Sequence, residues 1–86
     1  MNYPVIDPVE TGARIRELRM MRHLTVREIR EYLGLESEQA IYKWQRGESL
    51  PTIDNMYALS ELFETTIDNI LRGSKGEDRE SSLSVA

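Results

Sequence analysis

Residue types that usually mark enzymes, metal proteins and membrane proteins are scarce in this chain of 86 residues. It has no cysteine, which excludes disulfide bonds, cysteine-ligated zinc and thiol catalysis. The single histidine, His23, cannot form a histidine-cluster metal site or a serine–histidine–carboxylate set, and no glycine-rich phosphate loop is present. No apolar run approaches the ~18 residues of a membrane span, and the N-terminus does not resemble a signal peptide. The sequence therefore predicts a cytoplasmic, non-enzymatic domain with no cofactor, metal ion, small-molecule substrate or membrane partner.

Basic residues are concentrated in the middle of the chain although the net charge is −4. Residues 11–47 contain eight Lys and Arg against five Asp and Glu, whereas residues 48–86 contain three against eight. A phosphate backbone responds to the local charge of a surface and not to the total charge of the protein. The excess is either scatter over a solvated surface or the basic side of a nucleic-acid interface.

The chain divides into three parts by composition. Residues 1–10 contain two of the three prolines and no helical period, so we expect an extended arm. Residues 73–86 are rich in serine, glycine and charge, and we expect a disordered tail because so few apolar side chains cannot offset the entropy of ordering. The folded unit is then predicted to be residues 11–72, without strands.

Five short helices are predicted in this unit, each beginning with a side chain that can accept a backbone hydrogen bond. Thr25 with Glu28 three residues later forms the signature of a capping box. The expected N-cap residues are Thr11, Thr25, Ser37, Thr52 and Thr66, and the expected stops are Gly34, Gly47 and Gly73. The predicted fold class is therefore all-α, a compact five-helix bundle.

Apolar residues at helical spacing define the expected core. The bulky Trp44 is expected to pack inside and not to bind a ligand. The inward-facing residues are predicted to be Ile15, Leu18, Met21, Val26, Ile29, Leu33, Ile41, Trp44, Ile53, Met56, Tyr57, Leu59, Leu62, Phe63, Ile67, Ile70 and Leu71.

The third predicted helix, residues 37–46, has the most informative surface. Ile41 and Trp44 look inward, and the opposite side carries Glu38, Gln39, Tyr42, Lys43 and Arg46. Gln, Lys and Arg can hydrogen-bond base edges and phosphates, and a tyrosine can offer its hydroxyl to a phosphate or its ring to a thymine methyl. A phosphate would also suit the helix N-terminus near Ser37. A short helix, a glycine-containing turn and a second helix with such a face form a helix-turn-helix layout.

An ordered set of apolar and turn residues supports this layout over about two thirds of the chain. The set consists of Ile15-Arg16-Glu17-Leu18-Arg19, Leu24-Thr25, Leu33-Gly34, Ile41, Trp44, Arg46-Gly47, Leu50-Pro51, Leu59, Leu62 and Ile67-Asp68-Asn69-Ile70-Leu71. With these residues the chain resembles the Cro/C1-type helix-turn-helix domains, or XRE family, of bacterial and phage regulators. The resemblance implies a Cro/C1 repressor-like fold, a sequence-specific transcriptional regulator, and double-stranded DNA as partner. It also implies a third helix in the major groove and a homodimer on two-fold symmetric sites.

Individual roles follow from the resemblance by position. Glu38, Gln39 and Lys43 look like base-reading residues, while Ser37, Tyr42 and Arg46 look like phosphate or mixed contacts. The start of the second helix touches the DNA backbone in this family. The resemblance thus implies a DNA-binding set of Thr25, Arg27, Ser37, Glu38, Gln39, Tyr42, Lys43 and Arg46.

The chain departs from the family pattern near this surface. Gln45 replaces the glutamate that usually pairs with Arg19, so that tie is expected to be a weaker hydrogen bond to a neutral amide instead of an ion pair. Glu48 replaces a commonly basic residue, and its negative charge reduces the attraction of this surface for phosphate. Arg30 replaces a small residue, and the following turn is one residue longer, which can move the third helix away or let Arg30 extend outward. We therefore predict that the second and third helices are spaced more widely than is usual in the family.

Other readings of the same residues stay open. Lys43 and Arg46 can be ordinary surface cations, and Glu38 can be surface filler as well as a cytosine contact. An alternative function is a protein-interaction module on the same fold, antitoxin-like or an adaptor, which the acidic total, Glu38 and Glu48 favour. The sequence specifies neither the operator nor the sign of regulation.

Overall fold

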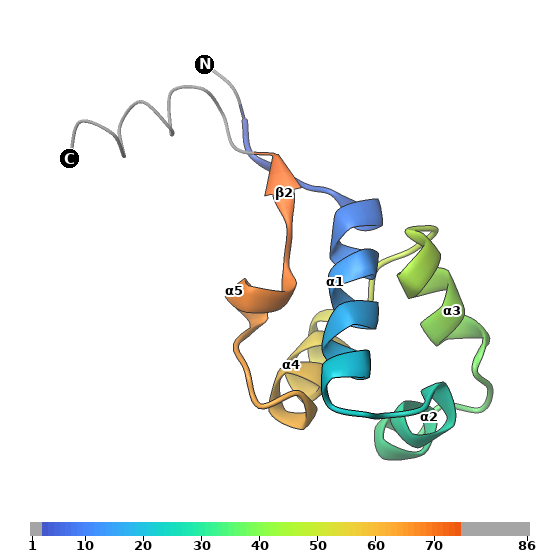
Figure 1. Cartoon of the computed structure of the whole chain (residues 1–86). Helices are drawn as coiled ribbons and strands as arrows, with labels where there is room; N and C mark the ends of the chain where they lie inside the picture. Colours follow the sequence, from blue (N-terminus) through green and yellow to red (C-terminus); the bar gives the residue numbers. More distant parts are fainter. Residues whose placement is uncertain (1–2, 75–86) are drawn as a thin grey trace.

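Five helices and one short pair of strands form the part of the chain that the computed structural model describes, residues 3–74 (Figure 1). In chain order they are β1 (Val5–Ile6), α1 (Pro8–Met21), α2 (Val26–Leu33), α3 (Gln39–Arg46), α4 (Ile53–Leu62), α5 (Ile67–Ile70) and β2 (Gly73–Ser74). The prediction of a five-helix, Cro/C1-like all-α fold is confirmed. The α1 helix stands in the middle of the bundle in Figure 1, between α3 on one side and α4 and α5 on the other.

The first helix begins earlier than predicted. The Asp7 side chain caps it by accepting hydrogen bonds from Val9 N (3.0 Å) and Glu10 N (3.1 Å), and Pro8 occupies the first turn, where its missing N–H costs nothing. The expected Thr11 cap is therefore wrong, and the extended arm ends before residue 8. Of the expected tail, residues 75–86 lie outside the described residues.

The two ends of the described chain are joined, which the sequence did not predict. β1 and β2 pair antiparallel, with Val5 opposite Ser74 and Ile6 opposite Gly73. Two-residue strands are too short to show alternation, so the expectation of no strands was wrong.

Thr11, fully buried inside α1, secures this junction with its hydroxyl group. The hydroxyl donates to the Arg72 carbonyl oxygen and accepts from the Arg72 N–H, both at 3.0 Å. The Asp7 N–H donates to the same carbonyl oxygen at 2.8 Å. Arg72 is thus tied to α1 by two hydrogen bonds and to the N-cap of α1 by a third, next to the strand pair.

Three of the other predicted caps are confirmed. The Thr25–Glu28 capping box is present, with distances of 2.8 and 3.0 Å, and Thr52 and Thr66 each accept a backbone hydrogen bond at 3.2 Å. The Ser37 cap is wrong because α3 starts two residues later, at Gln39, where Glu38 occupies the N-cap position without a side-chain bond. The Gly73 stop is also wrong, since α5 ends at Ile70 and Gly73 belongs to β2.

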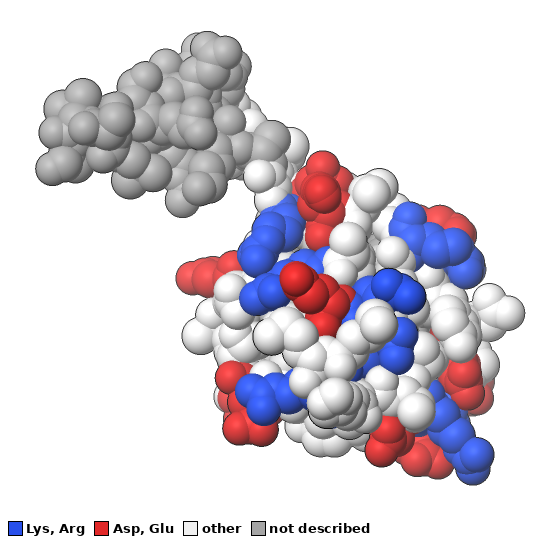
Figure 2. All heavy atoms as spheres, in the orientation of Figure 1, with Lys and Arg blue, Asp and Glu red and all other residues white. Residues whose placement is uncertain are grey.

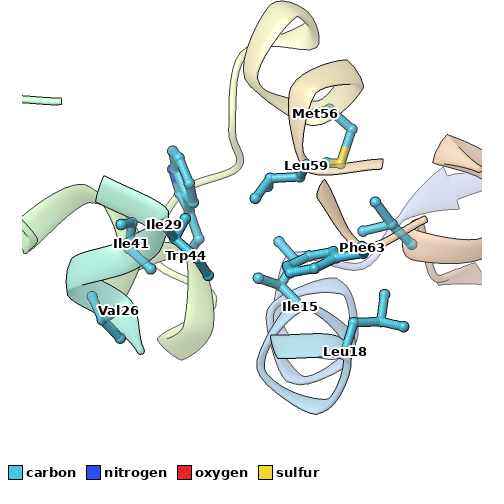
Figure 3. Close-up of a cluster of buried hydrophobic side chains, with 10 residues drawn as sticks. Ile15, Leu18, Val26, Ile29, Ile41, Trp44, Met56, Leu59 and Phe63 are labelled. Atoms are coloured by element: carbon cyan, nitrogen blue, oxygen red, sulfur yellow. The ribbon is translucent and has the colours of Figure 1, made fainter. Parts of the chain in front are cut away.

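The hydrophobic core joins all five helices, and nine of its members are labelled in Figure 3. Met21, Ile53 and Tyr57 were predicted to face inward but are 64 %, 72 % and 62 % exposed. Met21 ends α1, while Ile53 and Tyr57 lie one turn apart on the outer side of α4. The buried apolar residues are Ile15, Leu18, Val26, Ile29, Ile41, Trp44, Met56, Leu59, Phe63 and Ile70. Leu33, Leu62, Ile67 and Leu71 are only partly buried against them.

The closest helix contact brings the backbone of α1 against that of α3. A Cβ atom at Gly12 would collide with the carbonyl oxygen of Trp44 and lie 3.0 Å from that of Gln45. Arg19 adds a side-chain tie, donating from Nε to Gln45 Oε1 at 3.0 Å and from Nη1 to the Leu24 carbonyl oxygen at 2.8 Å. The Arg19–Gln45 tie is thus a hydrogen bond from a guanidinium to a neutral amide instead of an ion pair, as the sequence predicted.

Replacing Thr11 separates the role of its hydroxyl from that of its volume. Thr11→Val leaves the partly buried N–H and carbonyl of Arg72 without this partner and is expected to lower the free energy of unfolding by about 1–3 kcal/mol. Thr11→Ser keeps the hydroxyl and loses one methyl group, which costs about 0.8 kcal/mol. Urea unfolding measures both, and an equal loss for the two variants would contradict the bridging role.

Adding a methyl group at Gly12 tests the helix contact. Helix propensity alone would make Gly12→Ala stabilising by about 1 kcal/mol. The collision with the Trp44 carbonyl is expected to reverse this, with a net loss of about 1–3 kcal/mol. Thermal unfolding is the measurement, and Ala13→Gly at the exposed neighbouring position is the control, with an expected loss of about 1 kcal/mol. A raised melting temperature for Gly12→Ala would show that α1 and α3 are less closely packed than the structure indicates.

Candidate nucleic-acid interface

The outward side of α3 is positioned by its inward side. Ile41 is fully buried and Trp44 is 5 % exposed, and both belong to the same buried cluster as Ile29 and Val26 of α2 (Figure 3). The Gly12 contact and the Arg19 hydrogen bond hold the same helix against α1. With those faces covered, the remaining side of α3 is directed to solvent.

This solvent side collects most of the predicted DNA-contacting residues. Gln39, Tyr42, Lys43 and Arg46 are exposed on one face because they are spaced three or four residues apart, with Tyr42 and Lys43 adjacent. Tyr42 keeps 43 % of its surface accessible although it is aromatic, and no ion pair engages Lys43 within residues 3–74. We call Gln39, Tyr42, Lys43 and Arg46 the α3 face.

The turn before α3 adds a shallow, open depression of about 360 Å³ next to the α3 face. Ser37 is exposed, whereas Glu38 is half-buried at the N-cap position. The residues that line the depression are Arg30, Glu36, Ser37, Glu38, Gln39 and Tyr42. The structure therefore groups both predicted turn residues with the N-terminal half of the α3 face.

Arg30 stabilises this longer turn, a role that the sequence did not indicate. Its side chain is 28 % exposed and donates from Nη1 to the Leu35 carbonyl oxygen at 3.1 Å. Leu35 in turn packs against the core. Arg30 does not extend into solvent, because its guanidinium folds over the turn. A wider spacing of α2 and α3 stays a prediction.

The two predicted contacts from α2 are less available. Thr25 is exposed, but its hydroxyl already accepts the Glu28 N–H in the capping box. The Arg27 side chain is 74 % exposed and forms an ion pair with Glu31 at 3.5 Å. DNA contacts by Thr25 and Arg27 stay predictions.

At the other end of α3, Arg46 is already occupied by a carboxylate. Its Nε donates a hydrogen bond to Glu48 Oε2, and the two form an ion pair. This hydrogen bond lowers the pKa of Glu48, with a further contribution from the charge of Lys43, and the same bond raises the pKa of Arg46. Sequence reasoning identified both charges but missed the pair, because it spans the reversal of the chain at Gly47.

Charge on the visible side of the described residues is mixed. In Figure 2 the Lys and Arg side chains alternate with Asp and Glu over the bundle, and no large area of one sign appears on this face. Within residues 3–74 there is no cluster of three histidine, cysteine or acidic residues that could hold a metal ion. No helix in the same range is both long and apolar enough to cross a bilayer.

Comparison with known proteins gives a relative with a similar sequence. The HTH-type transcriptional activator BcrR of Enterococcus faecalis is 31 % identical over 67 residues, which are 78 % of this chain and 32 % of that protein. The chain thus spans about a third of the length of this relative.

Solved structures share the fold. The P22 c2 repressor protein, solved in complex with a synthetic operator, superposes with a TM-score of 0.66 at 31 % identity, over 74 % of this chain and 96 % of the repressor chain. The restriction-modification controller protein C.AhdI of Aeromonas hydrophila gives a TM-score of 0.67 at 23 % identity, over 74 % and 96 % of the two chains.

A family match agrees with the fold and with the arrangement of α2 and α3. Residues 15–70 match the helix-turn-helix family, which covers both of these helices and most of the core. The resemblance inferred from the sequence is confirmed. The chain belongs to the Cro/C1-type helix-turn-helix family.

Proposed function

We propose that the chain is a sequence-specific DNA-binding transcriptional regulator that places α3 in the major groove. The observation that carries the proposal is the exposed α3 face, backed by the buried Ile41 and Trp44. An α-helix with its side chains is about 10–12 Å in diameter, which suits a groove about 12 Å wide. The operator complex of the P22 c2 repressor and the name of the BcrR activator support this function.

Side-chain chemistry divides the proposed contacts. Gln39 and Lys43 read base edges, because an amide matches adenine and an ammonium matches guanine acceptors. Tyr42, Arg46 and Ser37 contact phosphates, which fix the register of the helix without reading sequence. Glu38, which is half-buried at the N-cap position, accepts a hydrogen bond from a cytosine amino group.

The rest of the proposal concerns assembly and place of action. Backbone contacts from Thr25 and Arg27 at the start of α2 fix the angle of approach. One α3 of eight residues covers only a few base pairs, so we propose a homodimer on a two-fold symmetric site. The proposed DNA-binding unit is the folded region of residues 11–72, extended back to Asp7 and Val5. We propose that this unit has no enzymatic activity. It acts in the cytoplasm, where bacterial and phage DNA lies.

Binding to duplex DNA at increasing salt tests the function as a whole. With about four to six phosphate contacts per subunit, log K is expected to fall against log salt with a slope of about −4 to −5 per monomer. Trp44 fluorescence or gel mobility can follow the binding, and selection from a random duplex library returns the preferred sequence and its symmetry. Complete absence of salt-sensitive binding would favour the alternative, a protein-interaction module on the same fold.

Lys43 variants test base reading by the α3 face. Lys43→Ala is expected to weaken binding to the selected duplex by about 1–3 kcal/mol and to relax preference at one base pair. Lys43→Arg keeps the charge but changes the donor geometry, so it should retain affinity for random duplexes and alter the preferred base. Equal losses on every sequence for Lys43→Ala, with full rescue by Lys43→Arg, would show that Lys43 contacts only phosphate.

A further inference from the structure

The backbone of Glu48 is fixed directly after α3. Gly47 has a φ of 79° in the left-handed region, its N–H donates to the Trp44 carbonyl oxygen at 3.0 Å, and the Glu48 N–H donates to the Lys43 carbonyl oxygen at 2.9 Å. This pair of bonds is the Schellman ending of a helix, which reverses the chain over its own last turn. The Glu48 side chain is thereby turned back toward α3.

Packing against α1 restrains this reversal further. A Cβ atom at Gly47 would lie 2.7 Å from Val9 Cα and 3.0 Å from Val9 N, so the turn lies directly on the first turn of α1. Since the backbone cannot move away without breaking this contact, the Glu48 carboxylate and Arg46 can separate by side-chain rotation but not by a shift of the turn.

The carboxylate meets a cation that the proposed function assigns to DNA. Arg46 and Glu48 are hydrogen bonded, and about half of each side chain is exposed, at 54 % and 51 %. Lys43, the other cation of α3, has no ion-pair partner within residues 3–74. One of the two positive charges of α3 is therefore open to a phosphate while the other is neutralised by the protein itself.

We propose that Glu48 occupies the place of a DNA phosphate at Arg46 in the unbound protein, and thereby lowers the affinity for duplex DNA of any sequence. The inference rests on the proposed function. A carboxylate and a phosphate oxygen compete for the same guanidinium donors, and a carboxylate that stays in place repels an approaching phosphate. Because Arg46 contacts phosphate, the attenuation applies to all duplexes and leaves the base preference set by Gln39 and Lys43 unchanged.

The variant Glu48→Gln measures the attenuation. It is expected to bind a labelled random-sequence duplex about two- to fivefold more tightly than the wild type, the range of exposed ion pairs. Its salt slope should be steeper by about 0.9, since one more phosphate contact releases counterions. The factor should be the same for a duplex obtained by selection. Unchanged or weaker binding of Glu48→Gln overturns the inference, and weaker binding would identify Glu48 as a residue that orients Arg46.

Two controls separate the pair from a general effect of charge. Glu64→Gln removes a carboxylate from another exposed ion pair, with Arg22, and is expected to change affinity by less than about 1.5-fold. In the Arg46→Gln background, Glu48→Gln should have no effect beyond that of this control. The same two- to fivefold gain without Arg46 would overturn competition at that residue.

The proposed function and this inference fail in different ways. If neither the wild type nor Glu48→Gln binds duplex DNA at low salt, the proposed function fails and the inference fails with it. If the wild type binds with the expected salt dependence and Glu48→Gln binds no better, only the inference fails. Urea unfolding of each variant checks that the fold is retained. We expect little change in the free energy of unfolding, because an exposed ion pair contributes little to stability.

Discussion

The orientation of α3 depends on one steric constraint, the contact between the backbones of α1 and α3 at Gly12. Only a residue without Cβ permits the carbonyl oxygens of Trp44 and Gln45 to come so close to another helix. Once α3 lies against α1, Ile41 and Trp44 point into the core, and the side chains on the opposite side of the helix point to solvent. The polar face of α3 is thus a consequence of how its apolar face is packed, and the Arg19–Gln45 hydrogen bond fixes its rotation.

The first turns of α1 connect this contact to both ends of the described chain. Asp7 starts the helix, Thr11 ties it to Arg72, and Val9 supports the turn at Gly47 that closes α3. Few residues separate these contacts, so the end of α5, the strand pair and the C-terminal end of α3 share one rigid support. The backbone at the C-terminal end of α3 is therefore held against α1, although it lies next to a loop.

The elements that the sequence predicted correctly are those with local causes. The capping box at Thr25 and the caps at Thr52 and Thr66 need only a hydroxyl and a backbone N–H three residues later. Thr11 offered the same local signal, but its hydroxyl bonds to Arg72, 61 residues away, which no local pattern reveals. Apolar spacing likewise identified Met56 and Leu59, yet placed Ile53 and Tyr57 inside, because spacing does not say how much of a helix its neighbours cover.

The candidate site shows the same limit in its electrostatics. Exposure of Gln39, Tyr42 and Lys43 follows from their spacing on one helix, and the sequence predicts it. Two residues apart on a continuous helix, Arg46 and Glu48 would not face each other. They meet because Gly47 adopts a left-handed conformation and reverses the chain. Counting charges along α3 therefore overestimates the positive charge available to a phosphate, and the fold, through one glycine, decides which of its two cations is free to act.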